Sequence, residues 1–174
     1  MTFDRAFALT IGEEGGLSNN PFDKGGMTYR GMQQRQFSAF LKAHDWPDKP
    51  VWEASEKETL LFYLGDAQWP GYWYGAHCPM TPELTGCFHF DSAVQHGPAN
   101  AIRLLQQALG VEVDGNFGPH TLGVLSAADD RTVLAAYFAA RKDFYAHIVA
   151  STPSQAIFWQ GWMNRLDHLK KALA

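Results

Sequence analysis

The residues best suited to chemistry follow the first expected helix. Glu14 stands at the end of that helix, and a run rich in Gly, Asn and Pro leads from it to Thr28. The run carries a second acid, Asp23, nine residues after Glu14, and the Thr28 hydroxyl five residues further on. Cleavage of a glycosidic bond needs a carboxylic acid that protonates the leaving oxygen, and commonly a second carboxylate that steers water. This spacing therefore indicates acid-catalysed hydrolysis.

Two positions compete for the acid. A helix C-terminus is an unfavourable place for negative charge, so Glu14 would hold its proton more firmly there, as a general acid must. Glu13 is the local competitor, because helical phase does not separate the two, and a solvated helix end is the plain alternative. Asp23 is equally compatible with an ordinary turn. If the run folds back across a cleft, Asp23 would hold and deprotonate a water, with Thr28 as a second hydrogen-bonding group on it.

The composition describes a folded globular chain. It has 174 residues, of which 46% are hydrophobic and 18% charged, enough for one well-packed domain. The net charge of −4 argues against nucleic acid as the main partner. We expect neither a signal peptide nor membrane insertion, because the N-terminus lacks a basic segment before an apolar stretch and no apolar run is long enough. Cys78 and Cys87 fit free thiols.

Hydrophobic spacing predicts a mostly α chain with a small β-hairpin or irregular loop after the first helix. Ser55 and Glu58 form a capping-box pattern. Pro82 is expected as the first residue of its helix. The expected helices cover residues 2–13, a stretch around 37–44, 56–64, 82–97, 98–109, 119–127, 131–150 and 154–173.

An aromatic loop over residues 65–80 follows the capping-box helix. Flat aromatic rings stack on sugar faces, so Tyr72 and Tyr74 are candidates to line a path for a glycan. For Trp73, core packing is the better interpretation. The loop thus supplies two candidate substrate-binding residues.

The run after the first helix resembles a known family. From Glu14 to Met32 it reads E-G-G-L-S-N-N-P-F-D-K-G-G-M-T-Y-R-G-M. This is similar to the opening signature of glycoside hydrolase family 108, typically E-G-G-Y-x-N-x-P-x-D-x-G-G-x-T-x-x-G-I. Leu17 replaces the usual Tyr and removes a hydroxyl near the acid, and Met32 replaces Ile. The acid–acid–threonine spacing also resembles the triad of phage-type lysozymes, whose last gap is usually one residue longer.

The resemblance continues downstream in the expected order. F-D-S-A-V-Q-H-G-P at residues 90–98 is similar to the family's F-D-x-A-V-N-x-G. Residues 105–122, ending in D-G-N-F-G-P-H-T-L, look like the companion peptidoglycan-binding region, and G-W-M-N-R at residues 161–165 resembles its C-terminal signature. The resemblance implies a lysozyme-like catalytic region over residues 1–88 and a helical peptidoglycan-binding region over 89–174, packed into one compact unit.

The family implies an N-acetylmuramidase that cleaves the β-1,4 bond between N-acetylmuramic acid and N-acetylglucosamine, without metal or organic cofactor. Glu14 matches the catalytic acid, and the roles of Asp23 and Thr28 come from the phage-type lysozyme pattern. Water orientation by Asp23 on the opposite face of the sugar implies inversion. The partner is peptidoglycan, and we expect a monomer. The rivals are a lytic transglycosylase, which leaves anhydro-muramic ends, and a non-catalytic wall-binding module.

Further substrate-binding candidates come from the same motifs. Gln95 takes the family's Asn position and would bond an N-acetyl group or the cleft backbone, unless it satisfies nearby helix-end carbonyls. Arg165 would pair with Glu14 across the cleft, a pairing that must loosen when substrate binds because it favours the ionised acid. Asn20, in the run itself, is the remaining candidate. The resemblance also implies an endolysin or secretion-type relative, made in the cytoplasm, passed through holin pores and active on the wall in the periplasm.

Two metal-site alternatives are weaker. His77–Cys78 and Cys87–His89 contain zinc-ligand types, but their spacings are shorter than those of structural zinc sites. Residues 114–118 resemble the start of a calcium loop without its later ligands. We predict a turn between helices there.

Overall fold

The computed structural model describes residues 2–11, 17–18 and 28–174, and these form a mostly α fold, as predicted. The predicted small β element is confirmed as three two-residue strands after the first helix. The α-helices and strands are α1 (Phe3–Ile11), β1 (Leu17–Ser18), β2 (Thr28–Tyr29), β3 (Met32–Gln33), α2 (Gln34–Ala43), α3 (Glu56–Leu64), α4 (Glu83–His96), α5 (Pro98–Leu109), α6 (Pro119–Ala127), α7 (Asp130–Ser151) and α8 (Trp159–Ala172). Short 3₁₀ helices cover Val51–Glu53, Cys78–Met80 and Pro153–Phe158.

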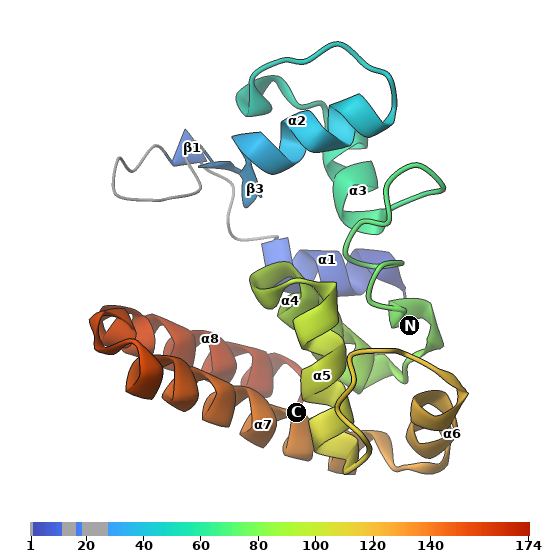
Figure 1. Cartoon of the computed structure of the whole chain (residues 1–174), viewed down its shortest axis with the longest axis vertical. Helices are drawn as coiled ribbons and strands as arrows, with labels where there is room; N and C mark the ends of the chain where they lie inside the picture. The colour runs from blue at the N-terminus through green and yellow to red at the C-terminus, as the bar shows by residue number, and fades with distance from the viewer. Residues whose placement is uncertain (1, 12–16, 19–27) are drawn as a thin grey trace.

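The elements form two unequal groups around α1 (Figure 1). The small sheet, α2 and α3 lie above α1 in this view, and α4 to α8 lie below it. Helices α7 and α8 run side by side as a long hairpin, and α6 packs on the opposite side of α5. The first helix therefore sits between the sheet and the C-terminal helices.

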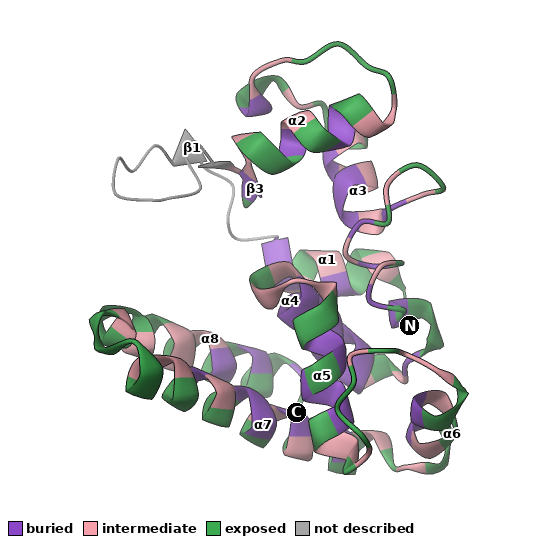
Figure 2. Ribbon diagram, in the orientation of Figure 1, coloured by how far each residue is buried: buried purple, intermediate pink, exposed green. Residues whose placement is uncertain are grey.

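Helix α4 is the centre of the C-terminal group and packs against α1, α5 and α7. Every residue from Thr85 to Ala93 is buried, and Figure 2 shows the buried positions gathered where these helices meet. A helix surrounded in this way needs no polar face toward solvent, yet four of these nine buried residues, Thr85, His89, Asp91 and Ser92, are polar. The polar residues that it does carry must find partners inside the protein.

The small sheet is an antiparallel meander in the order β1-β2-β3. Strand β2 pairs Thr28 with Gln33 and Tyr29 with Met32. The two residues between the strands, Arg30 and Gly31, both have left-handed backbones, with φ of 48° and 77°. This is the turn geometry that matches the twist of a tight hairpin.

Local sequence signals correctly predicted several helix ends. The capping box is present: Ser55 N–H donates to Glu58 Oε2 at 2.7 Å, and Glu58 N–H donates to Ser55 Oγ at 3.2 Å. Helices α5 and α6 begin and end where predicted, each opening with proline. These signals act within one helical turn, so they do not depend on distant packing.

Two boundaries were predicted wrongly. Pro82 is not the first residue of α4 but the cap residue before it, and Asp130 of α7 accepts hydrogen bonds from Leu84 N–H at 2.8 Å and Thr85 N–H at 2.9 Å. The side chain that caps this helix thus lies 46 positions after Leu84 in the sequence. The helix expected from residue 154 begins instead at Trp159, after a 3₁₀ segment.

The aromatic loop is held against the end of α3. The backbone N–H groups of Tyr72 and Trp73 both donate to the carbonyl of Tyr63 at 2.9 Å. Gly65 has φ of +90°, and a Cβ on it would lie 2.2 Å from the Pro70 carbonyl oxygen, so only glycine fits. Trp73 is 4% exposed and belongs to the core, as predicted.

Candidate active site

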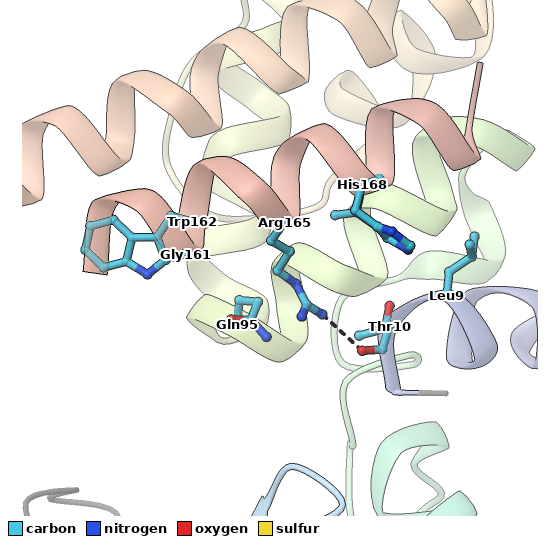
Figure 3. Close-up of a pocket in the computed structure, with 8 residues that line it drawn as sticks. Leu9, Thr10, Gln95, Gly161, Trp162, Arg165 and His168 are labelled. Carbon is cyan, nitrogen blue, oxygen red and sulfur yellow. Dashed lines mark hydrogen bonds between the residues drawn. The ribbon is translucent and has the colours of Figure 1, made fainter. Parts of the chain in front are cut away.

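A pocket of about 490 Å³ lies between the end of α1, the end of α4 and one face of α8 (Figure 3). A second pocket, of about 360 Å³, lies between the small sheet, α2, α3 and the end of α4. Gln95 lines both, so the two hollows adjoin at the last turn of α4. The first is lined by Leu9, Thr10, Gln95, Gly161, Trp162, Arg165, His168 and Leu169, and the second by Gly31, Gln33, Gln36, Tyr63, Tyr72, Val94, Gln95, His96 and Gly97.

Arg165, which lines the first pocket, belongs to a buried ion cluster. Asp91 of α4 is fully buried and binds Arg141 of α7 through Oδ1 and Nη1 at 2.6 Å. It also binds Arg165 of α8, with Nε 3.0 Å and Nη2 2.5 Å from Oδ2. Arg165 Nη2 donates in addition to the Thr10 carbonyl at 3.0 Å, the bond drawn in Figure 3. One carboxylate therefore joins α4, α7 and α8, and through Arg165 reaches the end of α1.

Two arginines share one carboxylate in this cluster. Burial by itself would raise the pKa of Asp91, but Arg141 and Arg165 outweigh it and hold that pKa below its usual range. Burial lowers the pKa of the neighbouring His96 to about 3, and the positive charge of Arg141 acts in the same direction. His96 is therefore neutral at neutral pH, and its Nε2 lies 3.1 Å from the hydroxyl of Tyr145.

Three predicted site residues, Glu14, Asp23 and Asn20, lie outside the described residues. Thr28 opens β2, and its backbone pairs with Ser18 and Gln33.

Tyr72 lines the second pocket and donates its hydroxyl to Gln36 Oε1 at 3.3 Å. Tyr74 is 50% exposed and lines neither pocket. Gln95 and Arg165 stand at the first pocket. The described partners of Arg165 are Asp91 and Thr10, and its pairing with Glu14 stays a prediction.

Sequence reasoning missed the ion cluster. Arg141 lies among apolar residues of the helix predicted over residues 131–150, and a charge on such a face signals a buried partner. Asp91 sits within the motif at residues 90–98, but nothing local pairs the two, which are 50 positions apart. Trp162 precedes Arg165 by three residues, so helical spacing could have placed both at the same pocket.

The metal-site alternatives find ordinary hydrogen-bond partners instead. His89 is buried, with Nε2 2.8 Å from the Ala76 carbonyl oxygen and Nδ1 2.8 Å from the Tyr137 hydroxyl. Asp114 Oδ1 accepts from Gln106 Nε2 and Asn116 N–H, both at 2.7 Å, which confirms the predicted turn. Within the described ranges, no group of three or more His, Cys, Asp or Glu side chains could hold a metal ion.

A mostly α fold with a small antiparallel sheet beside a groove is that of the lysozyme-like class of enzymes. Residues 7–97 match the sequence model described as Glycosyl hydrolase 108, and residues 100–167 match the Predicted Peptidoglycan domain. The chain therefore belongs to glycoside hydrolase family 108. It is a peptidoglycan-degrading glycoside hydrolase.

A solved structure of SagA from Brucella abortus shares the fold, with a TM-score of 0.81 at 22% identity, over 98% of this chain and 92% of that one. No curated protein matched. The two matched regions meet between residues 97 and 100, where α4 gives way to α5. The division predicted between residues 88 and 89 would fall within α4, and it stays a prediction.

Proposed function

We propose that this protein is an N-acetylmuramidase that hydrolyses the β-1,4 bond between N-acetylmuramic acid and N-acetylglucosamine. The observation that carries the proposal is where the described residues around the Glu14 motif lie. Thr10, four positions before Glu14, lines the first pocket. Thr28, the last residue of the acid–acid–threonine triad, pairs with Gln33, and Gln33 lines the second pocket. Both ends of the acid-bearing segment thus border the same groove.

In the proposed reaction, Glu14 donates its proton to the glycosidic oxygen as the bond from that oxygen to the anomeric carbon breaks. Asp23 holds a water on the opposite face of the sugar and takes a proton from it as the oxygen attacks the anomeric carbon. The Thr28 hydroxyl accepts a hydrogen bond from the same water or donates one to it. Attack from the opposite face inverts the anomeric configuration, and inverting enzymes hold their carboxyl groups about 6.5–9.5 Å apart.

The groove offers groups that suit the rest of the substrate. Gln95 stands where the two pockets adjoin, and its amide can bond an N-acetyl group. Tyr72 lines the second pocket, where an aromatic ring can pack against a sugar. Arg165 fixes the last turn of α1 through the Thr10 carbonyl, and we include its pairing with Glu14 in the free enzyme as part of the proposal.

Mass spectrometry of digested sacculi tests the reaction. We expect wild type to release fragments with reducing muramic acid ends, and Glu14→Gln and Asp23→Asn to release few or none while still binding sacculi. Anhydro-muramic ends would identify a lytic transglycosylase instead. Clearing of sacculi by Glu14→Gln would disprove the role of Glu14. Proton NMR of the first product anomer distinguishes inversion from retention.

We also propose a biological setting on the strength of the resemblance. The protein acts as a phage or prophage endolysin, or as a bacterial relative used in secretion, and works as a monomer. It is made in the cytoplasm and reaches the periplasmic wall through holin pores. Across the described residues, no helix is both long and apolar enough to cross a membrane. Lysis on co-expression with a holin, without lysis when the protein is expressed alone, tests the route.

A further inference from the structure

One face of α8 forms a wall of the first pocket, and a glycine lies in it. Gly161, Trp162, Arg165, His168 and Leu169 line the pocket at helical spacing. Glycine is an unfavourable helix residue compared with alanine. No left-handed φ explains Gly161, because its backbone lies outside that region. A Cβ on Gly161 would meet nothing within 4 Å, so close packing does not explain it either. Its effect is to leave the pocket wall open beside Trp162.

The Trp162 indole is held in a fixed position. It stacks on the ring of Tyr145, with centroids 4.6 Å apart and planes 10° apart. Tyr145 is itself fully buried, and its hydroxyl accepts from Arg141 Nε at 3.0 Å. The ion cluster beneath the pocket therefore supports the indole through Tyr145. A half-buried aromatic ring held in this way is a pre-organised surface for a flat ligand.

We propose that a sugar ring of the glycan strand stacks on Trp162, and that Gly161 provides the space the strand crosses. The proposal rests on the proposed function, and it assigns a subsite to α8. The pocket volume of about 490 Å³ lies in the range of small-ligand sites. Gln95 and His168 supply polar groups on the same pocket for hydroxyl or N-acetyl groups.

A sugar suits this wall better than the acidic stem peptide. The guanidinium of Arg165 donates through Nε and Nη2 to Asp91 and through Nη2 to the Thr10 carbonyl, so these donors face the protein rather than a ligand. The Gly161–Trp162 part of the wall carries no charged group.

A strand on Trp162 would continue past Gln95 into the second pocket, because Gln95 lines both. Residues 161 and 162 belong to the stretch matched by the peptidoglycan domain. That region therefore contributes to the hydrolase groove itself, beside residues of the stretch matched by the hydrolase family.

The test fills the space beside Trp162 and compares it with a matched control. Gly161→Gln places a side chain on the pocket wall. Gly123→Gln makes the same change in α6. Gly123 is also exposed, a Cβ on it would meet nothing within 4 Å, and it lines neither of the two pockets. Both changes replace a helical glycine by a better helix former, so both proteins should fold at least as stably as wild type.

Binding is measured with glycan strands freed of stem peptides by an amidase. All proteins in this comparison also carry Glu14→Gln, so that the strands stay intact; we expect Gly161→Gln to bind them about tenfold more weakly than the protein with Gly161, and Gly123→Gln to bind them equally well. In ¹⁵N NMR spectra, the indole N–H signal assigned by Trp162→Phe should shift on titration. Equal affinity of the two glutamine variants overturns the proposal. So does a Trp162 signal that stays still, or one that responds only to strands that retain their peptides.

Hydrolysis is scored separately on wild type and the two glutamine variants with Glu14 intact. Strand binding at Trp162 without release of reducing ends by wild type would uphold the subsite and refute the muramidase assignment. If wild type and Gly161→Gln release reducing ends at the same rate and bind the strands with the same affinity, the subsite is refuted and the muramidase assignment stays intact.

Discussion

Replacement of Asp91 by asparagine should strongly destabilise the protein. Asp91→Asn keeps the shape of the side chain but removes its charge and one of its two acceptor oxygens. Oδ1 accepts a hydrogen bond from Arg141 Nη1 and Oδ2 accepts one from Arg165 Nη2. Either orientation of the asparagine amide would therefore turn its NH₂ group toward one of the two arginines. Arg141 is fully buried and would keep its charge without an anion to balance it.

The expected cost follows from burial. Removing one partner of a buried ion pair costs about 3–5 kcal/mol, because the remaining charge is left uncompensated. For a chain of this size each kcal/mol lowers Tm by roughly 2–4 °C, so Asp91→Asn should lower Tm by about 6–20 °C. The surface pair between Arg5 and Glu83 provides the matched control, because both side chains are largely exposed. Glu83→Gln should cost less than about 1 kcal/mol.

Urea unfolding followed by tryptophan fluorescence, with calorimetry for Tm, measures both variants. The low pKa of Asp91 in the fold means that its contribution is present above the ordinary value of 3.8 and is lost as pH falls through the folded pKa. The difference between wild type and Asp91→Asn should therefore be constant near neutral pH and shrink in strong acid. An Asp91→Asn loss no larger than that of Glu83→Gln would refute the idea that this carboxylate clamps the helices.

Two further changes test links outside the pocket. The Phe40 carbonyl and Asp66 raise the pKa of His44 even though burial opposes them, and the pKa of Asp66, whose Oδ2 lies 2.9 Å from His44 Nε2, is lowered. Asp66→Asn should therefore lower the free energy of unfolding most between about pH 3.8 and 6.5, and this loss of stability should fade as pH rises through the folded pKa of His44. A loss of stability that does not change with pH contradicts this. Asp130→Ala removes the acceptor for the N–H groups of Leu84 and Thr85 and should cost about 1–2 kcal/mol in urea unfolding; no loss would show that water caps α4 equally well.

The sequence alone was enough to predict the fold class and most helix ends. Helices α5 and α6, the Ser55 capping box and the burial of Trp73 all follow from signals that act within a few residues. The same holds for the small sheet, where turn-forming residues interrupt helical spacing. Hydrogen bonds at a helix end join groups within one turn, so the residue types nearby are sufficient to specify them.

The tertiary structure alone decided which distant groups meet. Asp91 lies 50 residues from Arg141 and 74 from Arg165, and Asp130 caps a helix that begins 47 positions earlier. The acids can be read from the sequence. Each one pairs with the group that packing brings within hydrogen-bonding distance, and no local sequence pattern indicates which group that is. The motif around Glu14 indicated the chemistry. The packing of α1, α4 and α8 made the pocket beside which that motif begins.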